Sequence, residues 1–269
     1  MAPGVHWHAL EDDVVVGRAH ALHRPDGRVF LSVDTWRDDV FAVLADAMVR
    51  DLPPPVHTVV DEDDREVLAR WSSQGFVDHR YEGEYVVPTG PAPAATGRTP
   101  APAATGRTRV LPPDTVVLPA DRIGEQRLRA LDGLLRQEIE RSGGWAGLPA
   151  QLMPPPADGG AFDASQYTVV VHQEQDAGLL RIAPLPGRPR LGLIAVRSAY
   201  RRRGLARALL ADALGALRDR GIAAVRAEVD AGNVPAQRLL ASFGASRTGG
   251  AVELVHRPPV GPTPPDPPS

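Results

Sequence analysis

Three consecutive arginines followed by a glycine form the segment whose residue types most clearly indicate chemistry. Arg201, Arg202 and Arg203 precede Gly204, and the pattern Arg-x-x-Gly-x-Ala ends at Ala206. An apolar run precedes the segment and a leucine-striped run follows it, so it should join a strand to a helix. The free amides and positive dipole end of such a helix attract anions, and glycine lets a phosphate approach the backbone. The pattern in this context predicts phosphate binding, although three arginines alone are more typical of a solvated surface cluster.

Periodicity and helix-end signals predict the surrounding elements. Leucine and alanine recur at helical spacing from Leu205 to Leu217, which predicts a helix with one apolar face that stops at Gly221. Residues 222–229 should form a second strand, roughly parallel to the one at 191–196. Asn233 is suited to cap the next helix. The expected order is strand, phosphate-binding turn, helix, strand, helix.

Two segments in this order resemble the signature motifs of the GNAT N-acetyltransferase superfamily. The first runs from Ile194 to Arg207, and the second runs from Glu228 through Asn233 to Gly244. The resemblance covers about residues 165–257. It implies an α/β (α+β) fold of the GNAT type, in which a mixed central sheet is flanked by helices.

The resemblance also implies acetyl-CoA as the co-substrate. The pantetheine arm would lie along the strand that ends at Val196, and the pyrophosphate would lie on the amides after Arg201. Arginine guanidinium groups would neutralise its charge, and the side-chain amide of Asn233 would contact the cofactor. The cofactor-binding residues expected on this basis are Ile194, Ala195, Val196, Arg201, Arg202, Arg203, Gly204, Leu205, Ala206, Arg207 and Asn233.

Acyl transfer to an amine needs a route for the amine proton. Alkyl amines have a pKa near ~10.4, so only about one in a thousand is neutral at pH 7. Glu228 stands where the family branch that acetylates protein N-termini carries its catalytic glutamate. The hypothesis is that Glu228 accepts this proton through water. The alternative is a strand-end carboxylate that bonds a nearby arginine such as Arg226.

One position departs from the family pattern. Many members carry a tyrosine seven residues after the asparagine, where it protonates the leaving thiolate, but Leu240 stands there in this chain. Two functions remain open. The first is an N-acetyltransferase that moves acetyl from acetyl-CoA to a primary amine, of a small molecule or a protein N-terminus, by direct sequential transfer. The alternative is a non-catalytic acyl-CoA-binding or regulatory GNAT-like protein.

Composition limits the remaining classes. The chain has 269 residues, a net charge of −3 and no cysteine, which excludes disulfides, thiolate zinc sites and a cysteine acyl-enzyme. The net charge argues against nucleic-acid binding, and the histidine pairs lack carboxylates at metal-ligand spacing, so no metal is expected. No secretory signal and no apolar run of about 20 residues is apparent. A cytoplasmic protein without membrane contact is therefore expected.

A duplicated nonapeptide divides the chain. Residues 91–99 recur unchanged at 100–108, and their proline-rich, non-aromatic composition predicts a linker. The predicted parts are a degenerate GNAT-like domain at 1–88, a linker at 89–109, a catalytic GNAT domain at 110–257 and a disordered proline-rich tail at 258–269.

The predicted N-terminal domain repeats the order of the second half in shortened form. A hairpin, a helix, a strand, a second helix and a final strand are expected before residue 88. The place of the phosphate-binding turn is taken by residues 34–39, which contain no glycine and three aspartates. Carboxylates there would repel pyrophosphate, so this half should not bind CoA. Trp71 holds the place of the family tyrosine and is expected to be a core aromatic.

Overall fold

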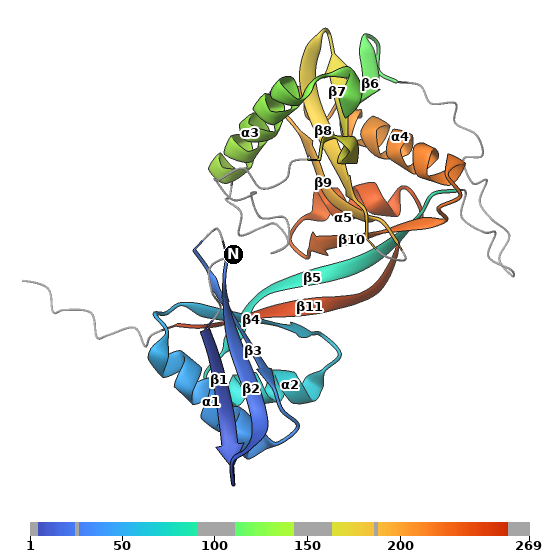
Figure 1. The fold of residues 1–269 in the computed structure, drawn as a ribbon. Helices are drawn as coiled ribbons and strands as arrows, with labels where there is room; N and C mark the ends of the chain where they lie inside the picture. Colours follow the sequence, from blue (N-terminus) through green and yellow to red (C-terminus); the bar gives the residue numbers. More distant parts are fainter. Residues whose placement is uncertain (1–4, 25–26, 91–110, 143–162, 186–187, 258–269) are drawn as a thin grey trace, which may run out of the picture. The chain divides into compact units, whose positions relative to one another are not determined.

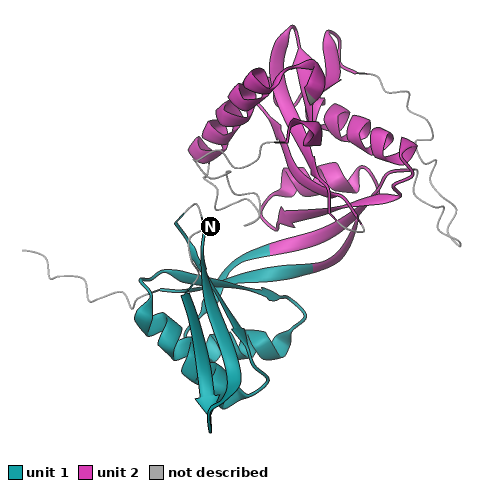
Figure 2. Cartoon of the chain, in the orientation of Figure 1, with its two compact units in different colours: residues 1–81, 250–269 teal, residues 82–249 magenta. Residues whose placement is uncertain are grey.

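The computed structural model of the chain describes residues 5–24, 27–90, 111–142, 163–185 and 188–257. The chain forms two compact units, one of residues 1–81 with 250–269 and the other of residues 82–249 (Figure 2). The predicted tail and, apart from its first two residues, the predicted linker lie outside the described residues. No helix in the described ranges is long and apolar enough to cross a membrane.

The first unit is a mixed sheet with two helices. Its strand order is β1-β2-β3-β4-β11-β5, and the predicted hairpin is the antiparallel pair β2–β3. β3 and β4 run parallel and are joined through α1. The elements are β1 (Val5–Glu11), β2 (Val14–His23), β3 (Val29–Asp34), α1 (Asp38–Asp51), β4 (Val56–Asp61), α2 (Arg65–Ser73) and the beginning of β5 (Val77–Pro88), with the end of β11 (Ser246–His256).

The core of this unit packs both helices against the sheet (Figure 1). α1 buries the stripe that includes Phe41 and Leu44, as helical periodicity requires. Trp71 of α2 is 2% exposed, and its ring meets Phe41 and Phe76 edge-on at 4.9 and 4.7 Å. The prediction that Trp71 is a core aromatic is confirmed.

The second unit is a mixed sheet with helices on both faces. Its strand order is β5-β10-β9-β8-β7-β6, and the two strands expected to be parallel, β9 and β10, are parallel. Its elements are the end of β5, β6 (Thr115–Pro119), α3 (Glu125–Arg141), β7 (Tyr167–His172), β8 (Gln175–Ala183), β9 (Arg190–Val196), α4 (Leu205–Asp219), β10 (Ala224–Asp230), α5 (Val234–Ala241) and the beginning of β11, with short 3-10 turns at Ala120–Arg122, Ala164–Gln166 and Ser198–Tyr200.

Two hydrophobic cores lie on opposite faces of this sheet. The larger contains the apolar stripe of α4, including Leu209 and Leu210, together with α5. The smaller contains Leu128, Leu131 and Leu135 of α3. Figure 1 shows α3 and α4 on the two sides of β7, β8 and β9. The site elements are therefore held by packing on both faces.

Each unit is completed by a strand that follows the other half in sequence. Residues 82–88 of β5 pair antiparallel with β10, and residues 251–256 of β11 pair antiparallel with β4. The predicted boundaries at residues 88 and 110 assign all of β5 to the first half and all of β11 to the second half. The compact units instead divide inside β5 and inside β11, so that each of these strands belongs to both units. Periodicity identifies a strand but not its partner, so the sequence alone did not indicate this exchange.

A buried carboxylate on the exchanged strand β11 connects three other parts of the first unit. The Glu253 side chain is 1% exposed and lies 3.0 Å from Arg28 Nη1, 2.8 Å from Arg80 Nη2 and 2.9 Å from His57 Nδ1. Burial acts to raise the pKa of Glu253, but the hydrogen bond with His57 and the charges of both arginines outweigh it and hold the pKa below its usual value. The charged form of Glu253 therefore stabilises the position of β11 in the sheet of the first unit.

Replacing Glu253 with alanine is expected to destabilise the first unit. The change removes the carboxylate that two largely buried guanidinium groups contact. Breaking a buried charge cluster in this way typically costs about 3–5 kcal/mol of unfolding free energy. Urea unfolding, with hydrogen exchange to localise the effect to residues 1–81, measures the change. The control is Asp46→Ala, which removes an exposed carboxylate from α1, and equal losses in both variants would contradict the expectation.

Acid is expected to destabilise this unit through the same residue. Because the pKa of Glu253 is lower in the folded chain than in the unfolded chain, its contribution is present above the unfolded value of about 4.3. The contribution is lost as the pH falls through the lower folded value. Urea midpoints measured from pH 7 to pH 2 should fall more steeply for the wild type than for E253A over the acid range. Parallel curves would mean that Glu253 does not carry this pH dependence.

Candidate functional site

β9 reverses its face pattern at a glycine. In the register with β8, Leu191 pairs with Ile182 and Leu193 pairs with Arg181, so Gly192 is the extra residue of a β-bulge. As a result Leu191 packs in the core with α4 and α5, whereas Leu193 packs in the core with α3. Regular alternation would place these two leucines on the same face. The bulge therefore changes the course of β9 immediately before its last residues.

β9 and β10 separate at the same point. Their described register consists of two pairs, Arg190 with Arg226 and Leu191 with Ala227. Beyond them, residues 193–196 continue to pair with β8 on one side only. The backbone of the predicted cofactor strand, including Ile194 and Val196, thus turns an edge toward the opening between β9 and β10. An extended ligand can add to such an edge as a strand does.

The turn after β9 leads into α4 through two left-handed residues. Arg202 has φ 65° and Gly204, the N-cap, has φ 80°. Left-handed backbone at a non-glycine residue is strained, and such strain tends to occur at functional sites. A Cβ on Gly204 would come no nearer than 4.0 Å to Pro112, so its conformation, rather than lack of space, is what favours glycine.

The start of α4 has the properties of an anion site. Its first turn holds no acidic residue, and no side chain caps it. The first helical N–H bond runs from Ala208 to Gly204, so the amides of Leu205, Ala206 and Arg207 precede the helical ladder. These amides and the helix dipole can bind a phosphate without a lysine.

The arginines of the turn spread outward from this point. Arg202 is exposed. The other three make side-chain contacts, namely Arg201 Nε to the Val196 carbonyl at 3.1 Å, Arg203 Nη1 to His172 Nε2 at 3.4 Å and Arg207 Nη1 to Ser242 Oγ at 2.6 Å. The contact of Arg203 is the longest of the three. The structure thus places all the predicted turn residues at one helix start, with their guanidinium groups around it.

Glu228 is the first residue of β10 beyond its last pair with β9, at the edge of the opening. Its carboxylate forms an ion pair with Arg190. Glu228 thus bonds an arginine, as the alternative interpretation supposed, although the partner is Arg190 and not Arg226. Burial raises the pKa of Glu228, while Arg190 acts to lower it and the carboxylate of Glu84 acts to raise it further. A carboxylate with a raised pKa is a stronger base than an exposed one.

Comparison with known proteins agrees with this geometry. Residues 145–245 match the model of the acetyltransferase (GNAT) family. This match lies within the second half of the chain. No curated protein matches the sequence.

Solved GNAT structures resemble the chain over both halves. A GCN5-related N-acetyltransferase from Sphaerobacter thermophilus has 18% identity and a TM-score of 0.60, covering 92% of this chain and 79% of its own. A tandem GNAT protein from the clavulanic acid biosynthesis pathway has 15% identity and a TM-score of 0.57, covering 94% and 82%. A GCN5-related N-acetyltransferase from Kribbella flavida has 13% identity and a TM-score of 0.58, covering 90% and 88%. At these identities the likeness shows the GNAT fold, as the sequence predicted.

Two further positions of the GNAT signature have structural roles. Asn233 caps α5, and its Oδ1 accepts a hydrogen bond from the Ala236 amide at 3.1 Å. The cap uses the oxygen of the side-chain amide, so the predicted cofactor contact would fall to its NH2 group. Leu240 is 2% exposed and belongs to the core with α4 and α5. The side chain that replaces the family tyrosine therefore packs and does not face a ligand.

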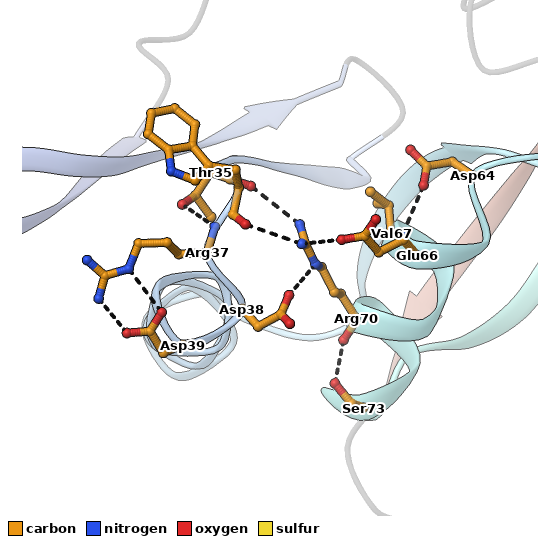
Figure 3. A network of polar contacts seen from close by, with 10 residues as sticks. Thr35, Arg37, Asp38, Asp39, Asp64, Glu66, Val67, Arg70 and Ser73 are labelled. Atoms are coloured by element: carbon orange, nitrogen blue, oxygen red, sulfur yellow. Dashed lines mark hydrogen bonds and ion pairs between the residues drawn. The ribbon is translucent and has the colours of Figure 1, made fainter.

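The first unit has the same layout, but its helix start is occupied by protein carboxylates (Figure 3). Asp38 and Asp39 lie in the first turn of α1, where the GNAT domain has no acidic residue. Arg70 of α2 lies 2.6 Å from the Asp38 carboxylate and donates to the Thr35 carbonyl at 3.4 Å. Arg37 bonds Asp39. A pyrophosphate at this helix start would meet negative charge.

The opening beside β3 is also partly filled. β3 and β4 have two described pairs, the second between Phe30 and His57, as β9 and β10 do. The next residue of β4, Thr58, stands where Glu228 stands in the GNAT domain, and its hydroxyl donates to the Leu31 carbonyl at 3.0 Å. A hydroxyl thus stands in place of the Glu228 carboxylate and bonds the backbone of β3. This supports the expectation that the first unit does not bind CoA.

One group of side chains has metal-ligand geometry. Single donor atoms of His57, His79 and Glu253 lie within 4.8 Å of one another. Two guanidinium groups already contact the carboxylate of Glu253, and their charge disfavours a cation at that point. The donor set therefore suits a structural charge cluster better than a metal site.

Three residues of the site were not identified from the sequence. Gly192 occupies an ordinary position in an apolar run, and only the strand register reveals the bulge. Arg190 is separated from Glu228 by the whole of α4, and Glu84 lies opposite Glu228 on the exchanged strand β5. No local signal connects these residues, because their proximity results from strand pairing.

Proposed function

We propose that the protein is an N-acetyltransferase that transfers acetyl from acetyl-CoA directly to a primary amine. The observation that carries the proposal is the separation of β9 from β10 immediately before an uncapped helix start. GNAT proteins are acyltransferases, and residues 145–245 match the model of that family. The acetyl donor, the amine acceptor and the direct mechanism are proposed from the resemblance to the GNAT family, and the geometry of these residues is compatible with them.

The residues present fit acetyl-CoA in three respects. The edge of residues 193–196 suits the amide groups of an extended pantetheine arm. The amides of Leu205, Ala206 and Arg207 suit a pyrophosphate, and the exposed Arg202 adds positive charge beside them. The thioester at the far end of the arm would then lie in the opening, close to Glu228.

In the proposed reaction the acceptor first loses a proton to water held by the Glu228 carboxylate. The amine nitrogen then attacks the thioester carbonyl carbon, and a C–N bond forms. Backbone amides of β9 near Ile194 stabilise the negative oxygen. As the C–S bond breaks, the attacking nitrogen loses its second proton to water, and CoA leaves as a thiolate that takes up a proton from water. Thiols ionise near ~8.5, so this leaving group does not require the tyrosine that Leu240 replaces.

Replacing Gly204 with valine is expected to weaken acetyl-CoA binding by about tenfold or more. A β-branched residue is strained at φ 80°, and left-handed backbone costs about 1–2 kcal/mol for such residues. Isothermal titration with acetyl-CoA measures the affinity. Gly215→Val is the matched control, because Gly215 lies on the same helix with open space around it. Unchanged affinity in G204V would remove the proposed pyrophosphate site.

Replacing Glu228 with glutamine is expected to lower kcat by about 10²–10⁴-fold. The wild-type rate should fall as the pH drops through the raised pKa of Glu228, because only the carboxylate accepts a proton. The variant should lose this acid limb. CoA release measured from pH 5 to pH 9 tests both effects, with the exposed Glu174→Gln as control. An unchanged pH profile would exclude Glu228 as the base, and acetyl-CoA binding without CoA release in the wild type would favour the non-catalytic alternative.

A further inference from the structure

We propose that the acceptor carries an anionic group close to its amine, as an α-amino acid does. A cavity beside Glu228 that is lined by both acidic and basic side chains, called here the two-signed cavity, recognises both groups. The inference rests on the proposed transferase function and names the class of its acceptor. The cavity lies in the second unit, where β5 and β10 pair, and encloses about 120 Å³. Its lining includes Glu84, Glu228, Arg188 and Arg226.

The negative side of the cavity is suited to an ammonium group. Glu84 on β5 pairs directly opposite Glu228 on β10. Like charges in such a position destabilise a sheet. Arg190 pairs with Glu228, whereas Glu84 is exposed and has no ion-pair partner among the residues that the structure describes. A cationic amine beside both carboxylates would relieve this repulsion and would lie next to the proposed base.

The positive side is suited to a carboxylate. Arg226 precedes Glu228 by two residues on β10, so both side chains lie on the same face of the strand. Arg188 lies just before β9, and the neighbouring Pro189 carbonyl accepts the Arg226 amide at 2.9 Å. Neither arginine pairs with a carboxylate in the described parts of the chain. Two free guanidinium groups on one cavity can bind a carboxylate by charge-assisted hydrogen bonds.

The arrangement sets the order of the groups in the ligand. The anionic group would lie toward Arg226, and the amine toward Glu228, which is one step nearer the opening between β9 and β10. The spacing of alternate residues on a strand, about 6.8 Å, suits an acid and an amine that are separated by one or a few carbons. Pockets for drug-sized ligands span about 300–1,000 Å³, so a cavity of about 120 Å³ suits a small zwitterionic end rather than a ring system.

An acceptor panel tests this assignment. CoA release from acetyl-CoA is measured with the standard L-α-amino acids, with the matching carboxamides and with putrescine, which has no anionic group. The best free acid is expected to exceed its carboxamide by about tenfold or more in kcat/KM, because a charged hydrogen bond is lost in the amide. Arg226→Gln and, separately, the exposed Arg188→Gln should each lower this ratio at least about fivefold. Arg218→Gln, at the far end of α4, should keep the wild-type ratio.

The outcomes separate this inference from the function on which it rests. A preference for free acids that both cavity variants reduce supports the two-signed cavity. Equal rates for acids and amides, or CoA release with putrescine alone, would overturn the acceptor class and leave the transferase proposal standing. Bound acetyl-CoA with no release from any member of the panel would overturn the acceptor class and count against catalysis as well.

Discussion

The break in hydrogen bonding between β9 and β10 is the constraint on which the rest of the GNAT domain depends. A parallel pair normally continues along the strands, but the bulge at Gly192 sends Leu193 to the opposite face, and the ladder ends at Leu191. The cores on both faces hold the separated strands apart. Unpaired backbone in a sheet is costly unless a ligand or water satisfies it. Side-chain packing thus maintains the opening, and the backbone groups at its edge need a ligand or water as hydrogen-bond partner.

The two halves show how one layout can keep or lose such a site. Both have a parallel pair that ends after two residues, followed by a turn and a helix. In the GNAT domain the helix start is free of carboxylates and its N-cap is Gly204. In the first unit Asp38 and Asp39 supply the negative charge that the helix dipole favours, and they pair with Arg70 and Arg37 respectively. Side-chain carboxylates therefore provide the negative charge at the start of α1, and no external anion is needed there.

The sequence predicted what local signals encode. The turn at Gly204, the apolar stripe of α4 and the capping role of Asn233 follow from spacing and residue type, and the structure has each of them. β1 and β6 were not predicted, and both are short edge strands with mixed exposure. The partner of Glu228 was not predictable either. It is set by the pairing of Arg190 on β9 with Arg226 on β10, two strands that α4 separates in the sequence. Residue types near Glu228 do not indicate which strand lies beside it.

The strand exchange has a consequence for how the chain matures on the ribosome. Glu253 and Arg28, which meet in the first unit, are 225 residues apart. When the amino-terminal half leaves the ribosome, one edge of β4 is therefore unpaired until residues 251–256 have been synthesised. Contacts of such long range form slowly, and the waiting strand edge is open to pairing with other chains in the meantime. The sheet of the first unit is thus complete only when residues from both ends of the chain are present.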